Sequence, residues 1–288
     1  MGANGRSDEA TAAVTGAAEC DPPVADCAVD AAGVFTVELD LPGGMPDGTA
    51  RVLLRRRPGT GDQATDVTLE TTPVPGRPGR VRALLPVEPV LAEGHWEVRV
   101  SGGGVAMPVA AGIRDLRALV DRTPPVPAGP LAVRVPYAGK EGHLVLRVWR
   151  REGHVEAGGL RLADGALTVR ARLVGVAPEP GARVLLRRRG KGGPQHVVEP
   201  RTDDDGGVVF TVELAELLEE EPPRAAYWDL FWLPSPTAPR IRISRLLDDV
   251  AERKRVFVYP HTRVAGQRVF PYYTVDNDLS IEVNAPAG

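Results

Sequence analysis

The octamer ARVLLRRR occurs twice in this sequence, from Ala50 and again, 132 positions later, from Ala182. The same offset relates two tryptophans, Trp96 in GHWEVRV and Trp228 in AYWDLFW. Segments that recur in the same order and at nearly the same spacing are the signature of an internal repeat. The chain is therefore predicted to contain two copies of one unit, so a fold proposed for one half must also suit the other.

A further landmark extends the repeat to the end of each copy. PYAGKEGHLVLRV, from Pro136, matches PYYTVDNDLSIEV, from Pro271, at an offset of 135, which places Tyr137 opposite Tyr272. These landmarks divide the chain into a disordered tail over residues 1–30, a first module over residues 31–155 and a second module over residues 156–288.

The dominant hydrophobic period within each copy is two residues. Segments such as VFTVELDL, HWEVRV and HLVLRV alternate or run apolar, as half-buried strands do. Turn-forming segments such as PGGMPDG, SGGG and DDDGG separate them. We expect an all-β fold of two tandem Ig-like antiparallel β-sandwiches. Short helices are expected over residues 113–122 and 244–255, the second with Ser244 as its N-cap.

The composition limits the classes of function. The formal net charge is −3 at pH 7, which gives the chain no overall positive field for nucleic acid. No apolar run is as long as a membrane span, and the N-terminal segment lacks the apolar core of a signal peptide, so a cytoplasmic protein is expected. Six residues separate Cys20 from Cys27, a poor zinc spacing. Both are expected to be plain thiols in the tail.

Catalytic motifs are scarce. The sequence contains no Walker loop, no GxSxG and no HExxH, and its five histidines are scattered. The acidic turns at residues 203–207 and 276–278 are typical of hairpins. We therefore expect no metal and no cofactor, and the question of enzymatic activity stays open, with the balance toward a non-catalytic protein.

Comparison of the two copies isolates a candidate binding surface. If Trp96, Val98 and Val100 face the first core, the same register turns Trp228, Leu230 and Trp232 toward the second. The outward residues of the second copy then include two aromatics around a carboxylate, which suits stacking on a sugar or anchoring of a protein interface. The predicted contact residues are Tyr227, Asp229, Phe231, Tyr272, Tyr273, Asp276 and Asp278.

The repeated arginines form a second candidate surface. Alternation along the strand places Arg55 and Arg57 on one face, with Arg187 and Arg189 at the equivalent positions of the second copy. Such a stripe is suited to contact with phosphates or carboxylates. A charged edge strand that discourages aggregation explains the same pattern, and duplication of a structural strand favours this second interpretation.

The C-terminal segments YWDLFWLP, PRIRISRLLDDVAERKRVFVYP and PYYTVDNDLSIEV resemble the C-terminal accessory region of actinobacterial teichoic-acid-type glycosyltransferases and glycerophosphotransferases. In those proteins a WDL strand, an RIGRLLDD-like segment and a closing PYYT hairpin recur. The resemblance covers roughly residues 225–283. It implies a tandem β-sandwich region that supports oligomerisation or binds the polymer substrate. The matching region does not include the transferase domain, so the resemblance implies no catalytic residue.

These observations predict a non-catalytic binding or assembly protein of a glycan, polyol-phosphate or natural-product pathway. Its partner would be a glycan or polyol-phosphate ligand, or a pathway transferase, contacted through the second module. Two alternatives stay open. One is a small-molecule tailoring enzyme with a pocket between the modules, Asp229, Asp276 or Asp278 as its acid–base group, and Tyr272 or Tyr273 polarising the substrate. The other is a homo-oligomerisation unit.

Overall fold

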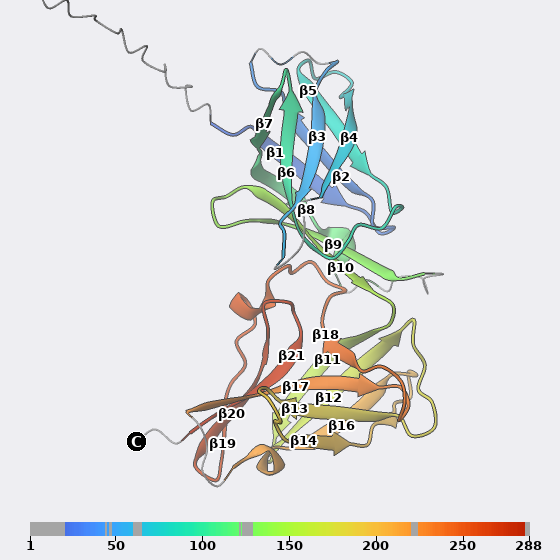
Figure 1. Cartoon of the computed structure of the whole chain (residues 1–288), viewed down its shortest axis with the longest axis vertical. Coiled ribbons are helices and arrows are strands. Elements are labelled where there is room, and N and C mark those ends of the chain that lie inside the picture. The colour runs from blue at the N-terminus through green and yellow to red at the C-terminus, as the bar shows by residue number, and fades with distance from the viewer. Residues whose placement is uncertain are drawn as a thin grey trace, which may run out of the picture.

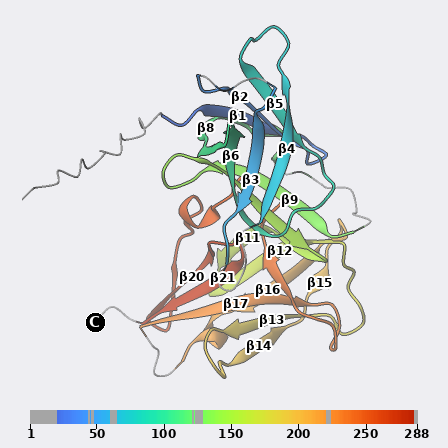
Figure 2. The ribbon, with the colours of Figure 1, turned by 45° about the horizontal axis from the view of Figure 1, so that its top comes forward.

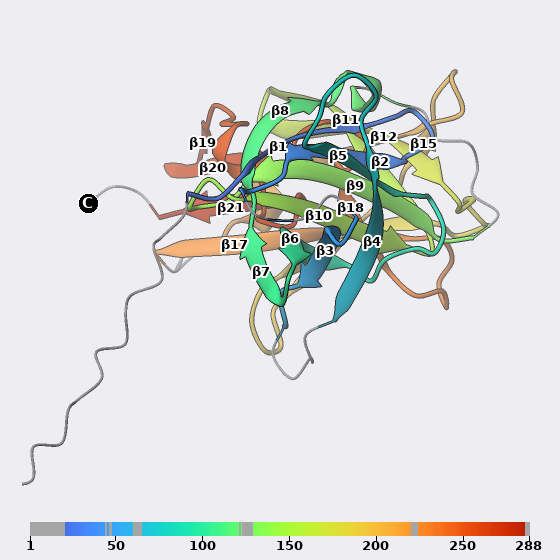
Figure 3. The same ribbon diagram turned by 90° about the horizontal axis from the view of Figure 1, so that it is seen from above.

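The computed structural model describes residues 21–285, except for residues 44, 46–47, 60–64, 121, 123–128 and 220–223. The chain forms two lobes stacked along its longest axis, with the N-terminal half in one lobe and the C-terminal half in the other (Figure 1). A view tilted by 45° keeps the lobes distinct (Figure 2), whereas a view from above superposes them (Figure 3).

The N-terminal half contains the strands β1 to β10. Their order in the sheet is β8-β1-β2-β5-β4-β3-β6-β10-β9, with β7 beside β6. The strands are β1 Val24–Val29, β2 Phe35–Asp40, β3 Arg51–Arg56, β4 Asp66–Pro73, β5 Arg80–Leu85, β6 Gly94–Gly102, β7 Val105–Pro108, β8 Ala110–Asp115, β9 Leu131–Ala138 and β10 Leu144–Arg151.

The C-terminal half contains the strands β11 to β21. Their order is β15-β16-β12-β11-β18-β17-β21-β20-β19, and β13 pairs with both β14 and β17. The strands are β11 His154–Ala163, β12 Ala166–Val174, β13 Arg183–Arg188, β14 Gln195–Val198, β15 Arg201–Thr202, β16 Val208–Glu213, β17 Ala225–Leu233, β18 Ile241–Ser244, β19 Thr262–Val264, β20 Gln267–Tyr273 and β21 Leu279–Asn284. The fold is all-β, as predicted.

The two halves share most of their pairing scheme, although β4 pairs with β5 in the first half and β17 pairs with β18 in the second. The repeated octamer forms β3 and β13, and its register is the same in both: Arg56 lies opposite Trp96 on β6, and Arg188 lies opposite Trp228 on β17. Parallel pairing also recurs at equivalent places, between β1 and β8 and between β11 and β18. The repeat in the sequence is therefore a repeat of strand order and register.

Each half has its own hydrophobic core. Both registers predicted for the inward residues are confirmed: Trp96, Val98 and Val100 lie in one core, and Trp228, Leu230 and Trp232 lie in the other. The core of the N-terminal half also receives residues from the other half, namely Val174, Leu246, Leu247 and Ala251. The segment after β18 therefore joins the halves by apolar packing, which favours a fixed junction.

The two predicted helices are wrong. Residues 110–115 form β8, and only the 3-10 turns Arg117–Leu119 and Arg253–Arg255 lie near the expected positions. Ser244, the expected N-cap, is instead the buried last residue of β18, and its hydroxyl donates to Asp278 Oδ1 at 2.6 Å. The described part of the chain contains no helix long and apolar enough to cross a membrane.

The expected tail ends earlier than predicted. Val24–Val29 forms β1, and its alternating residues Ala25, Cys27 and Val29 are buried. Burial raises the pKa of the Cys27 thiol to about 12, so this cysteine is a core residue rather than a thiol in a mobile tail. The strand was missed because the short apolar side chains of VADCAV give only a weak strand pattern in the sequence. Cys20 lies outside the described residues.

Candidate functional site

Residues of the predicted contact surface meet on the outer face of β17, β20 and β21. Tyr227 and Asp229 alternate with the core residues of β17, and Tyr272 projects on the same side from β20, which is joined to β17 through β21. A cavity of about 510 Å³ opens over this face and is called the C-terminal cavity here. Its lining residues are Arg189, Tyr227, Asp229, Arg242, Lys254, Tyr272, Thr274, Val275, Asp276, Asp278 and Glu282.

Asp229 is the centre of the polar contacts in this cavity. Its carboxylate lies 2.7 Å from Nη2 of Arg189 and 3.2 Å from Nη1 of Arg242, and the hydroxyl of Ser280 donates to it at 2.9 Å. Burial by itself raises the pKa of Asp229, but hydrogen bonds from Arg189 and Ser280 and the charge of Arg242 outweigh it, so the pKa lies below its ordinary value. Asp229 is an ionised acceptor, not a proton donor.

Tyr227 and Tyr272 form an edge-to-face pair, with ring centroids 6.1 Å apart and an interplanar angle of 70°. The guanidinium carbon of Arg189 lies 5.5 Å from the Tyr227 ring centroid. Burial raises the pKa of the Tyr272 hydroxyl, which therefore stays a neutral hydrogen-bonding group. The pair presents two fixed, half-buried rings to the cavity.

Two predicted contact residues lie elsewhere. Tyr273 is completely buried in the C-terminal core, because neighbouring residues of a strand face opposite sides and Tyr272 faces outward. Phe231 has the predicted direction, but only 9% of it is exposed, since the guanidinium carbons of Arg240 and Arg242 lie 4.7 and 4.9 Å from its ring centroid. Neither residue lines the cavity.

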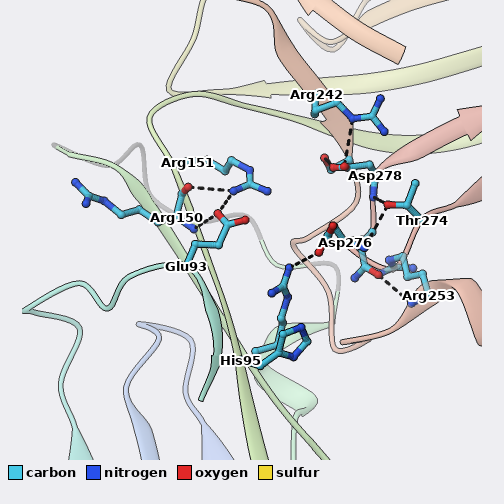
Figure 4. Close-up of polar contacts among 12 residues, drawn as sticks. Glu93, His95, Arg150, Arg151, Arg242, Arg253, Thr274, Asp276 and Asp278 are labelled. Atoms are coloured by element: carbon cyan, nitrogen blue, oxygen red, sulfur yellow. Dashed lines mark hydrogen bonds and ion pairs between the residues drawn. The ribbon is translucent and has the colours of Figure 1, made fainter. Parts of the chain in front are cut away.

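Asp276 and Asp278 lie in the loop between β20 and β21 and line the cavity. Figure 4 shows their polar contacts. Asp278 pairs with Nε of Arg242 at 3.2 Å. Asp276 points toward the N-terminal half, where its Oδ1 accepts a hydrogen bond from Nη2 of Arg147 at 2.7 Å. The Thr274 hydroxyl oxygen accepts hydrogen bonds from the backbone N–H groups of both aspartates, which fixes the loop.

Asn277 is a structural residue that sequence reasoning missed. Its φ of 62° lies in the left-handed region, which asparagine tolerates better than most residues. Its buried side chain accepts a hydrogen bond from the backbone N–H of Arg253 at 2.9 Å and donates one to the carbonyl of Val250 at 2.9 Å. The VDND loop therefore has a local structural role. Among the described residues, no three or more His, Cys, Asp or Glu side chains gather as metal ligands would.

Most of the predicted arginine contacts are already paired within the protein. Arg55 forms two hydrogen bonds with Asp66, at 3.0 and 2.8 Å, and Arg57 pairs with Glu97 at 2.9 Å. Arg189 is held by Asp229, and Arg187 does not line the cavity. Paired guanidiniums of this kind do not form an open site for a polyanion. The predicted charged edge strand is wrong as well, because β3 lies between β4 and β6, and β13 lies between β14 and β17.

The N-terminal half carries the same arrangement at the equivalent positions. His95 and Tyr137 replace Tyr227 and Tyr272, and their centroids lie 6.0 Å apart at 71°. The Arg57–Glu97 pair replaces the pair of Arg189 and Asp229. Here, however, residues of the C-terminal half lie nearby: Tyr137 lines a junction cavity of about 300 Å³ together with residues 249–252, 255 and 256.

The junction cavity lacks the acid–base groups expected there. Asp229 and Asp278 line the C-terminal cavity and do not line the junction. The junction contains Asp249 instead, whose pKa is raised, mainly by hydrogen bonding with the neighbouring carboxylate of Asp248. Asp248 is held ionised by the guanidinium of Arg253 at 2.6 Å. The short DD sequence was the only sequence signal for this pair.

No family model and no curated protein matches this chain. Among solved structures, a crystal structure of residues 217–571 of S. aureus TarS is 14% identical with a TM-score of 0.29, over 65% of this chain and 54% of that one. A second crystal structure of S. aureus TarS is also 14% identical with a TM-score of 0.29, over 71% and 38%. This chain spans about half of the first structure. A TM-score of 0.29 is too low to establish a shared fold.

Proposed function

We propose that this chain is a non-catalytic glycan-binding protein whose ligand lies in the C-terminal cavity. The observation that carries the proposal is the fixed Tyr227–Tyr272 pair beside a carboxylate held by two arginines. Aromatic rings offer apolar surface to the C–H faces of a sugar, while planar charged groups suit its hydroxyls. The lowered pKa of Asp229 supports a binding role over general-acid catalysis.

A glycan is favoured over a polyol phosphate by the charges of the cavity. A phosphate chain needs unpaired cations, but Arg189 and Arg242 are engaged by Asp229 and Asp278. Lys254, exposed at the rim, forms no ion pair with the described residues, but a single free ammonium group is too little to bind a chain of phosphates. The four carboxylates that line the cavity outnumber its three basic side chains.

The scaffold is proposed to be two tandem Ig-like β-sandwich modules that arose by duplication, with their boundary near residue 155. The common strand order, the common octamer register and the separate cores support this division. β1 belongs with the first module, which therefore begins before residue 31. In such a stack, the outer face of β17, β20 and β21 in the second module would stay exposed to solvent.

Assembly is the second candidate function, because the equivalent face in the N-terminal half already makes a protein contact, the pair of Arg147 with Asp276 at 2.7 Å. Size-exclusion chromatography with light scattering distinguishes it from glycan binding. A stable oligomer that the double variant Tyr227→Ser/Tyr272→Ser dissociates would support assembly, whereas a monomer at micromolar concentration would exclude a stable self-association of this face.

Calorimetric titration with neutral oligosaccharides and with glycerol-phosphate oligomers tests glycan binding. We expect a saccharide series to bind, and Tyr227→Ser/Tyr272→Ser to weaken that binding at least about tenfold, since each ring loses its stacking surface. Val197→Ser, at an exposed position on β14 outside the cavity, is the matched control. The proposal fails if no saccharide binds, or if the double variant binds as the parent protein does.

A further inference from the structure

The equivalent faces of the two halves carry opposite charges at the repeat position of Arg147. Arg147 on β10 corresponds to Glu282 on β21. The strand register confirms the correspondence: Arg147 lies opposite His95, and Glu282 lies opposite Tyr227. A basic residue in one copy is thus replaced by an acidic residue in the other, beside equivalent aromatic pairs.

In the N-terminal half, Arg147 contacts an acidic group from the other half of the molecule. Arg147 is only 4% exposed, and its guanidinium is paired at 2.7 Å with Asp276 of the C-terminal half. The guanidinium also lies 4.8 Å from the Trp149 ring centroid. The basic side chain therefore meets an acidic group that another part of the molecule supplies.

At the equivalent position in the C-terminal cavity, the acidic side chain has no such partner. Glu282 is half-buried and lines the cavity, and within the described part of the chain its carboxylate forms no ion pair or hydrogen bond. The other three carboxylates of the cavity are engaged: Asp229 and Asp278 by arginines, and Asp276 by Arg147. Glu282 is the carboxylate left to meet a ligand.

We propose that the C-terminal cavity binds a saccharide bearing a protonated amino group, which Glu282 receives beside the rings of Tyr227 and Tyr272. The inference rests on the proposed glycan-binding function and specifies its ligand. An ammonium group forms a charge-assisted hydrogen bond with a carboxylate and is attracted by the faces of aromatic rings. The sugar ring packs on the tyrosine pair, and its hydroxyls contact the Asp229 cluster.

Two oligosaccharide series of equal length, one of glucosamine and one of N-acetylglucosamine, are the probes. Acetylation removes the positive charge and keeps the sugar ring, so calorimetric titration at pH 6 isolates the contribution of the ammonium group. We expect the glucosamine series to bind about tenfold more tightly or better, as a hydrogen bond between charged groups allows. This preference should shrink as salt increases.

Glu282→Gln should abolish the preference while leaving weak binding of the N-acetylated series. Glu141→Gln, in the loop between β9 and β10 of the N-terminal half, is the control for loss of one acid away from the cavity. Lys254→Ala should maintain or increase the preference, because it removes a like charge from the rim. Thermal unfolding checks that each variant is folded.

The possible failures are distinguishable. Equal binding of the two series, or a preference that persists in Glu282→Gln, overturns the amino-sugar inference and leaves the glycan proposal intact. If neither these series nor the neutral oligosaccharides bind, the proposed function itself fails.

Discussion

The outer face of β6 and β10 in the N-terminal half and that of β17 and β21 in the C-terminal half are built alike, yet they meet different surroundings. Each has a T-shaped aromatic pair beside an arginine–carboxylate pair, with nearly identical ring geometry. The first borders a junction cavity of about 300 Å³ that residues of both halves line, whereas the second borders a cavity of about 510 Å³ lined by residues of the C-terminal half. The same arrangement of side chains therefore occurs in two different surroundings.

The comparison shows where the two halves diverge. Their cores keep the same tryptophan and the same register, because changing the volume of a packed core is costly. Their outer faces diverge in residues such as Arg147 and Glu282, where a change of charge alters the partner but not the fold. The faces are the part of the repeat that is free to acquire function.

The largest expected effect tests whether the cores are equivalent. Trp96→Ala and Trp228→Ala should each lower the free energy of unfolding by about 3–5 kcal/mol, the usual range for a buried tryptophan. Trp96→Ala should cost slightly more, since the Trp96 indole donates to the carbonyl of Ala92 at 3.0 Å and the Trp228 indole nitrogen has no such acceptor in the described structure. Urea unfolding measures both variants.

Val197→Ala, at an exposed position, serves as the control for that pair and should change stability by less than about 0.5 kcal/mol. If Trp228→Ala costs no more than this control, the two cores are not equivalent.

A smaller effect is expected at the junction. Asp276→Asn leaves the buried guanidinium of Arg147 without its charged partner. It should lower the free energy of unfolding by about 1–3 kcal/mol. Its repeat counterpart is Glu141, whose carboxylate is exposed and lies 3.6 Å from His143. Glu141→Gln should therefore change the unfolding free energy by less than about 0.5 kcal/mol. Equal costs would mean that the Arg147 contact does not distinguish the halves.

The sequence predicted the features that depend on short-range periodicity. Alternation along HWEVRV and AYWDLFW placed the core tryptophans correctly, and the repeat predicted the equivalence of β3 and β13. It also singled out Tyr227, Asp229 and Tyr272, which the fold brings to one cavity. These residues could be predicted from the sequence because the comparison of two copies reveals which outward positions have changed.

Long-range contacts account for what the sequence did not predict. The apolar spacing of SRLLDDVAERKR suggested a helix, but Leu246 and Leu247 pack into the core of the other half, and their backbone N–H groups donate to Glu156. Tyr273 was placed outward because PYYT does not reveal which tyrosine continues the strand alternation. The contact between Arg147 and Asp276 joins residues 129 positions apart, and no local pattern specifies it.

The smallest predicted effect concerns the pH dependence of the two faces. Burial, with the positive charges of Arg147 and Arg57, lowers the pKa of His95 from 6.5 to about 4, although Asp276 acts in the opposite direction. Because the folded state holds this imidazole neutral, its contribution to stability is complete above about pH 6.5 and declines as the pH falls toward 4. We expect a loss of about 1–2 kcal/mol after allowance for solvent screening.

His95→Gln should remove this loss, because glutamine does not titrate, and unfolding in urea at intervals from pH 7 to pH 4 measures it. The equivalent position in the C-terminal half carries Tyr227 and no imidazole, so this acid sensitivity belongs to the face of the N-terminal half alone. A variant that loses stability over the same interval as the parent protein would place the sensitivity elsewhere. Asp276→Asn in the protein that retains His95 sharpens the test: without the carboxylate that favours protonation of His95, the total loss between pH 7 and pH 4 should increase.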